Sequence, residues 1–369
     1  MYNITKTIGV GVVVVTLTVM ACSKSPSVNA NSSLFGNYDQ TAMLNNIGNN
    51  VLMAGITTEA TSATAAQAAI SAFAATPNSA TLTAAQTAWA TMAQNWAIVA
   101  PIDFGPIQDN LIESDVDTWP ATDSKIEAAI TAGTPATAVG ADTKGLKGLE
   151  YLLFDPTGNA AVLAKYTGTG AAGRAVFLNS VAQDMVTQTG NLQSDWKSSY
   201  LSSFESAKGN DVSSSVSQLV NTISLYLDQV KNMKIGNPIG MGVKINDNQP
   251  HPTLIEYTIA EESIPVMVAN MQAMKAAFDG GSGQGLDDLL NYVKAQNNGQ
   301  NLSTVVDNQF NDAITKLNAI NPPYATAVST QTAQLQAAFA SIKTLIAYFK
   351  VDVANNLGVT ITFTDTDGD

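Results

Sequence analysis

Apolar residues recur at alternating steps of three and four along much of the chain, and this period constrains the fold more than any other feature. The clearest series is Leu335, Phe339, Ile342, Ile346, Phe349 and Val353. Similar series lie in 82–99, 216–230 and 264–278. Steps of three and four place apolar side chains along one seam of a helix, as in helix bundles. The sequence therefore predicts an all-α protein.

Turn-forming residues divide this pattern into eight or nine predicted helices. That number is too large for one four-helix bundle and suits two. We therefore predict two similar four-helix-bundle domains at 37–205 and 206–354, followed by a tail at 355–369. Alternating residues in 359–363 predict one short C-terminal strand.

Composition restricts the partners of the protein. Of the 369 residues, 45% are apolar and only 13% are charged, with a net charge of −13. This acidic balance argues against a nucleic-acid partner, because phosphate binding needs a basic face. The chain has a single cysteine, which excludes an intramolecular disulfide and a thiolate metal cluster.

The first 21 residues have the pattern of a lipoprotein signal peptide. Lys6 precedes an apolar run at 8–20 that is short for a bilayer span, and Ala21 stands just before Cys22. We expect Cys22 to become the lipidated N-terminus, with 22–36 as a polar tether. An ordinary secretory signal with an incidental cysteine is the alternative. The prediction places the protein in the bacterial cell envelope, anchored to a membrane (the outer membrane, facing the periplasm or the surface).

Common catalytic motifs are missing from the sequence. His251 is the only histidine and lies between Pro250 and Pro252, which favours a loop over a helix. A single histidine does not support a nucleophile triad, and there is no HExxH motif, phosphate-binding glycine loop or dinucleotide fingerprint. We interpret His251 as a loop residue rather than a ligand or base.

Two clusters contain the candidate functional residues. The run 101–127 has one base and is interrupted by Trp119; its seven carboxylates are Asp103, Asp109, Glu113, Asp115, Asp117, Asp123 and Glu127. The second cluster, GLKGLEYLLF at 145–154, places Lys147 and Glu150 one helical turn apart. A surface ion pair worth about 0.2–1 kcal/mol is the alternative interpretation of that pair.

These clusters resemble the imelysin-like family of bacterial periplasmic proteins and lipoproteins linked to iron uptake. The family motif GxHxxE aligns with Gly145, Lys147 and Glu150, followed by the apolar run 151–154. Further landmarks in the family's order are Trp89, Trp96, Phe104-Gly105-Pro106, Asp117-Thr118-Trp119-Pro120, Glu256 and Ser263. The resemblance implies two similar helical bundles with a functional site where they meet.

Two positions depart from the family pattern. Lys147 stands where the motif has histidine, and Ala100 stands where many members have a glutamate. Iron or another divalent cation is the cofactor that the resemblance implies, and Glu150 is the remaining metal-ligand candidate. An ammonium has three donors and no acceptor, so it does not ligate a metal. We hypothesise that the Lys147 ammonium occupies the place of the cation and neutralises Glu150. Burial could instead depress the lysine pKa and expose its lone pair.

The sequence thus predicts a non-catalytic, lipid-anchored binding protein of the cell envelope, associated with iron uptake. The expected ligand site consists of Lys147, Glu150, Asp103, Trp119, Asp117, Glu256 and Ser263. Its ligand would be anionic or neutral, such as a chelate or glycan, and iron-uptake transport components are the expected partners. The alternatives are a metallopeptidase, which the family was once taken to be, and a scaffold that docks a membrane transport partner without a small ligand.

Overall fold

The computed structural model describes residues 34–363. They belong to one compact unit, Leu34–Asp369. The predicted signal peptide, the lipidation residue Cys22 and the tether up to residue 33 lie outside the described residues, as do residues 364–369 of the tail. Among the described residues, no helix combines the length and the apolar character needed to cross a membrane.

Four helices of the first half of the chain form a bundle. The elements of this half are α1 (Gln40–Asn46), η1 (Ile47–Met53), α2 (Ala54–Ala75), α3 (Ser79–Val99), α4 (Pro106–Asp109), α5 (Ile112–Asp117), α6 (Asp123–Ala132), η2 (Ala136–Ala138), η3 (Ala141–Thr143), α7 (Gly145–Leu153), α8 (Asn159–Thr167), α9 (Ala171–Asp195), η4 (Trp196–Tyr200) and α10 (Leu201–Ser206). α2 packs against α3 and α9, and α7 packs against the same two helices.

The second half of the chain forms a similar group of four. Its elements are α11 (Ser215–Gln229), η5 (Val230–Gly236), η6 (Pro252–Leu254), α12 (Ser263–Asp279), α13 (Leu286–Tyr292), β1 (Gln296–Asn297), β2 (Gln300–Asn301), α14 (Leu302–Asn318), α15 (Tyr324–Thr330), α16 (Thr332–Ala347), η7 (Tyr348–Val353) and α17 (Ala354–Leu357). α11 packs against α12 and α16, and α14 packs against the same two helices. The all-α fold is therefore confirmed.

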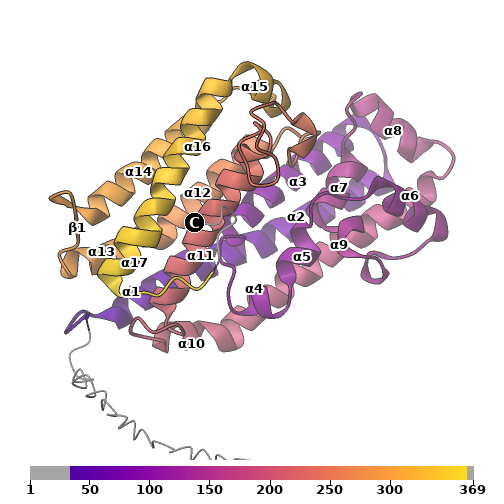
Figure 1. The fold of residues 1–369 in the computed structure, drawn as a ribbon. Coiled ribbons are helices and arrows are strands. Elements are labelled where there is room, and N and C mark those ends of the chain that lie inside the picture. The colour runs from indigo at the N-terminus through magenta and orange to yellow at the C-terminus, as the bar shows by residue number, and fades with distance from the viewer. Residues whose placement is uncertain (1–33, 364–369) are drawn as a thin grey trace, which may run out of the picture. The chain divides into compact units, whose positions relative to one another are not determined.

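The two halves meet where α12 packs against α3. The fully buried Asn270 of α12 donates from Nδ2 to the Ala97 carbonyl oxygen of α3 at 2.7 Å. In Figure 1 the orange and yellow helices of the second half lie beside the indigo and magenta helices of the first. The boundary between residues 205 and 206 stays a prediction; α10 ends at Ser206 and α11 begins at Ser215.

The apolar periods correspond to buried helix faces. The six residues of the series in α3 are all buried: Leu82, Ala85, Trp89, Met92, Trp96 and Val99. The described residues contain more helical segments than the eight or nine expected, for two reasons. π-helical turns divide single long helices, as η1 does between α1 and α2, and the short helices α4, α5, α6 and α8 connect long ones.

The predicted C-terminal strand at 359–363 is wrong. Asn221 of α11 satisfies the backbone there instead: its Nδ2 donates to the Thr360 carbonyl oxygen at 3.0 Å, and its Oδ1 accepts from Thr362 N–H at 2.8 Å. One amide side chain thus takes the place of a neighbouring strand. The short antiparallel pair that does form joins Gln296–Asn297 to Gln300–Asn301.

Candidate functional site

The start of α7 is held against α5 by a close backbone contact. Gly145 has φ +68°, and a Cβ there would overlap the carbonyl oxygen of Val116, which comes just before the last residue of α5. Trp89 of α3 donates from Nε1 to the Leu146 carbonyl oxygen at 3.0 Å. Glycine is needed here because only it allows both the positive φ and the close approach. These contacts bring Lys147 to the end of α5.

The Lys147 ammonium is buried between two carboxylates and an aromatic ring. Its Nζ lies 2.9 Å from Asp117 Oδ1 and 3.7 Å from Glu256 Oε2. It also lies 3.0 Å from the centroid of the Tyr257 ring, a cation–π arrangement. Lys147 is only 3% exposed. The ammonium is thus compensated from several sides within the protein.

Glu256 connects Lys147 to a second buried lysine. Lys234, in η5, places its Nζ 2.6 Å from Glu256 Oε2. Burial by itself raises the pKa of Glu256, but Lys234 and Lys147 together lower it to about 2. Burial likewise opposes the charge of Lys234, and Glu256 outweighs it, so the pKa of Lys234 is raised. Asp117, Lys147, Glu256 and Lys234 therefore alternate in charge, and we refer to them as the ion-pair chain.

Glu150 does not form the predicted ion pair with Lys147. Its Oε1 instead accepts backbone N–H groups of Ile259 at 3.1 Å and Ala260 at 3.0 Å. Burial raises the pKa of Glu150, while these N–H groups and the charge of Lys147 oppose the rise. Glu150 of α7 thus holds the segment before α12 through its backbone. Asp117 and Glu256 form the ion pairs with Lys147 that were expected of Glu150.

A pocket of about 210 Å³ lies over these residues, and we name it the Lys147 pocket. Trp119, Asp123, Glu150 and Tyr257 line it together with Lys147. Five of the predicted site residues lie in or directly beneath it: Lys147, Glu150, Trp119, Asp117 and Glu256.

Ser263, the first residue of α12, belongs to the same site through the backbone. Its Oγ donates to the carbonyl oxygen of Glu256. This contact ties the start of α12 to the segment that carries Glu256 and Tyr257. Six of the seven predicted residues therefore come together at one place.

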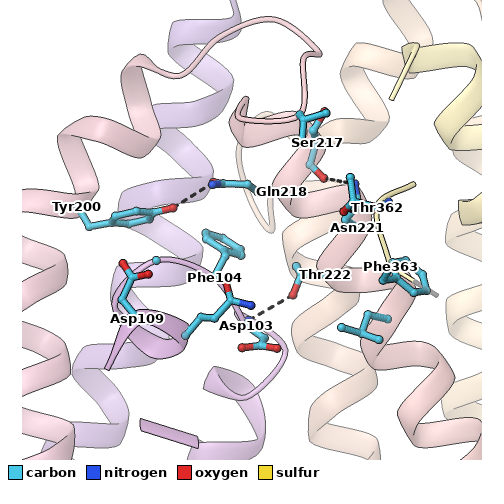
Figure 2. A pocket seen from close by; sticks show the side chains of 14 residues that line it. Asp103, Phe104, Asp109, Tyr200, Ser217, Gln218, Asn221, Thr222, Thr362 and Phe363 are labelled. Carbon is cyan, nitrogen blue, oxygen red and sulfur yellow. Dashed lines mark hydrogen bonds between the residues drawn. The ribbon is translucent and has the colours of Figure 1, made fainter. Parts of the chain in front are cut away.

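Asp103 is the predicted residue that the structure places elsewhere. Its backbone N–H donates to Thr222 Oγ1 at 3.2 Å, and it lines a different pocket of about 460 Å³ (Figure 2). We name this second cavity the tail pocket, because Thr362 and Phe363 of the C-terminal tail form part of its wall. The charge of Asp103 helps to raise the pKa of Glu113.

Two buried residues outside the predicted set have a recognisable sequence context. Tyr257 directly follows the predicted Glu256, and Glu59 is the only charged residue in the 22 residues of α2. Glu59 is 1% exposed; Ser62 Oγ donates to its Oε2 at 2.8 Å, while its Oε1 has no hydrogen bond. Burial raises the pKa of Glu59 well above its ordinary value. A lone charge in an otherwise uncharged helix could have identified this buried carboxyl group.

Glu113 of α5 makes the stability of the protein depend on pH. Burial, followed by the charges of Asp103 and Asp117, raises the pKa of Glu113 from 4.5 to about 7. Between these values the folded state binds the proton that the unfolded state releases, so the free energy of unfolding falls as pH rises through this window. Glu113→Gln is expected to flatten that part of the pH profile in urea unfolding. An unchanged slope in the variant would contradict the assignment.

The residues around Lys147 do not fit a metal ion. Asp117 and Glu256 accept from ammonium groups, and Lys147 adds positive charge where a cation would bind. Within residues 34–363, no group of three or more His, Cys, Asp or Glu side chains is arranged to hold a metal. His251 lies apart in the loop before η6, with Nε2 2.9 Å from Asp247 Oδ1.

Comparisons with known proteins agree with the architecture. Iron-regulated protein A of Synechococcus elongatus is 24% identical over 242 residues, which is 63% of this chain and 62% of that protein, so the match spans less than two thirds of the relative. An iron-regulated protein A precursor from Parabacteroides distasonis has a similar fold, with TM-score 0.73 and 19% identity over 86% of this chain and 95% of that one. An imelysin-like protein from Psychrobacter arcticum gives TM-score 0.71 and 16% identity over 88% and 97%. The family model described as Imelysin matches residues 54–348, and the chain therefore belongs to the imelysin family.

Proposed function

We propose that this protein is a non-catalytic, lipid-anchored binding protein of the bacterial cell envelope, associated with iron uptake, and that the Lys147 pocket is its ligand site. Family membership and a relative named iron-regulated protein A support the association with iron. The signal-like sequence before Cys22 supports a lipid anchor in a bacterial membrane, for which we propose the outer membrane. Iron-uptake transport components are the proposed partners.

The observation that carries this proposal is the ion-pair chain beneath the Lys147 pocket. The Lys147 ammonium supplies positive charge from within the protein, and Asp117 and Glu256 compensate it. The pocket is also lined by two carboxylates, Glu150 and Asp123, by aromatic rings, and by the aliphatic side chains of Ile255 and Ile259. An anion gains little from a compensated lysine and is repelled by these carboxylates. The geometry therefore favours a neutral ligand with an apolar face, such as a glycan or an uncharged chelate.

A metallopeptidase would need an open metal position and a general base close to it. The buried ammonium stands where the motif histidine would ligate, and the chain's only histidine pairs with Asp247 in a loop. The described contacts do not favour this alternative.

Metal titration tests the role of Lys147. We expect calorimetry with Fe(II), Fe(III) and Zn(II) to give no micromolar binding by the native protein, because the ammonium repels the cation. Lys147→His is expected to gain binding, because a neutral imidazole can ligate, leaves Asp117 without an ammonium partner and leaves Glu256 paired with Lys234 alone. Lys147→Met removes the charge without adding a ligand, and it is the matched control.

Two results would overturn this assignment. The first is micromolar metal binding by the native protein that Glu150→Ala abolishes. The second is the absence of metal binding in a Lys147→His variant that retains the native circular dichroism, since position 147 would then not be the cation position. The anchor is tested separately: the mature protein should partition into the detergent phase of Triton X-114, and Cys22→Ala should remain in the aqueous phase.

A further inference from the structure

The tail pocket is a second cavity that is separate from the Lys147 pocket, and the two share no lining residue. Its volume of about 460 Å³ lies within the ~300–1,000 Å³ typical of small-molecule sites. Both halves of the chain contribute to its wall, as Figure 2 shows. The lining residues with polar or aromatic groups are Asp103, Phe104, Gln108, Asp109, Tyr200, Ser217, Gln218, Asn221, Thr222, Thr362 and Phe363.

Hydrogen bonds hold the walls of the tail pocket in place. Thr222 Oγ1 donates to the Pro101 carbonyl oxygen at 2.9 Å and accepts from Asp103 N–H at 3.2 Å, which joins α11 to the loop after α3. The amide of Asn221 holds the tail over the pocket through the backbone of Thr360 and Thr362. The cavity is therefore built by ordered contacts between distant parts of the chain.

Several polar groups of the tail pocket retain unused hydrogen-bonding capacity. Tyr200 O–H donates to Gln218 Oε1 at 3.1 Å, which orients this amide and leaves its two N–H groups as donors (Figure 2). In the described part of the chain, the side chains of Asp103, Gln108 and Asp109 make no hydrogen bond or ion pair. The wall thus combines unused amide donors with unused carboxylate acceptors.

The donors and acceptors of the wall indicate which class of ligand the tail pocket can bind. Among the described residues, no lysine, arginine or histidine lines the pocket, so its two carboxylates disfavour an anion. A metal ion or an amine would satisfy the carboxylates but offers no acceptor to the N–H groups of Gln218. A hydroxyl group both donates and accepts, and therefore suits both kinds of partner. The rings of Phe104, Tyr200 and Phe363 offer apolar surface to the C–H faces of such a molecule.

We propose that the tail pocket binds a neutral saccharide, with its hydroxyl groups donating to Asp109 and Asp103 and accepting from Gln218. This site is independent of the function proposed for the Lys147 pocket. It lies at a junction between the two halves of the chain, where α11 and the tail pack against the loop after α3.

Calorimetric titration of the purified protein with D-glucose, D-galactose, D-mannose, N-acetyl-D-glucosamine and their β-1,4-linked disaccharides tests the proposal. We expect saturable binding of at least one of them in the millimolar range. Gln218→Leu removes the amide donors, and Asp109→Asn removes the negative charge and replaces one acceptor oxygen by an N–H donor group. Each variant is expected to weaken that binding about tenfold. Both side chains are at least partly exposed, so the variants should keep the native circular dichroism.

Asp352→Asn is the matched control, because it makes the same chemical change at a partly exposed carboxylate that lines neither pocket. It should leave saccharide affinity unchanged. The proposal is overturned if no sugar saturates at millimolar concentration, or if putrescine binds more tightly than every sugar. It is also overturned if Asp123→Asn in the Lys147 pocket weakens binding while Gln218→Leu does not, because the sugar would then occupy that pocket.

Discussion

Replacing Lys147 by methionine is expected to lower the free energy of unfolding by about 3–5 kcal/mol. The substitution removes one partner of a buried ion pair and leaves Asp117 without its ammonium and Glu256 with Lys234 alone. An uncompensated buried carboxylate is costly, because the protein interior solvates its charge poorly. Urea unfolding followed by tryptophan fluorescence measures the loss.

Two further variants make this expectation specific. Lys125 also pairs with a carboxylate, Asp142 at 2.7 Å, but the Lys125 side chain is 62% exposed. Lys125→Met should therefore cost less than about 1 kcal/mol. Adding Asp117→Asn to Lys147→Met should recover part of the stability, because it removes the stranded charge. Equal losses for Lys147→Met and Lys125→Met would contradict the buried ion-pair chain.

Gly145→Ala is expected to destabilise the protein by about 3 kcal/mol through two additive costs, a left-handed backbone and a steric overlap. Gly145 has φ +68°, and the added Cβ would overlap the backbone carbonyl of Val116, which cannot rotate away as a side chain can. Separating α7 from α5 would also move Lys147 away from Asp117. Thermal and urea unfolding measure the loss of stability.

Gly133 provides the control for this experiment. It has nearly the same φ, +67°, at the end of α6, but an added Cβ there meets nothing within 4 Å. Gly133→Ala should therefore cost only the backbone component, about 1–2 kcal/mol. If the two variants lose the same stability, the contact between α7 and Val116 does not contribute.

Some features of the site depend on contacts that local sequence does not encode. Lys147 and Glu150 are one helical turn apart, which predicts that they pair, but the structure pairs Lys147 with Asp117 and Glu256. These partners are distant in the sequence and reach Lys147 only because α5 and the segment before α12 pack beside α7. The position of Asp103 in the acid-rich run 101–127 predicts that it belongs to the site. Its backbone N–H instead donates to Thr222, and Asp103 lines the tail pocket.

Local sequence by itself determined the helical class, because the apolar period of a helix is a property of the segment and burial follows it, as along α3. It also located the helix that carries the family motif, at Gly145–Leu153, and showed that Lys147 stands at the histidine position of that motif. Only the tertiary structure decided which carboxylates compensate that lysine, because their distances depend on how separate helices pack. It likewise decided that residues 359–363 form no strand: β propensity needs a neighbouring strand to pair with, and α11 offers the amide of Asn221 instead.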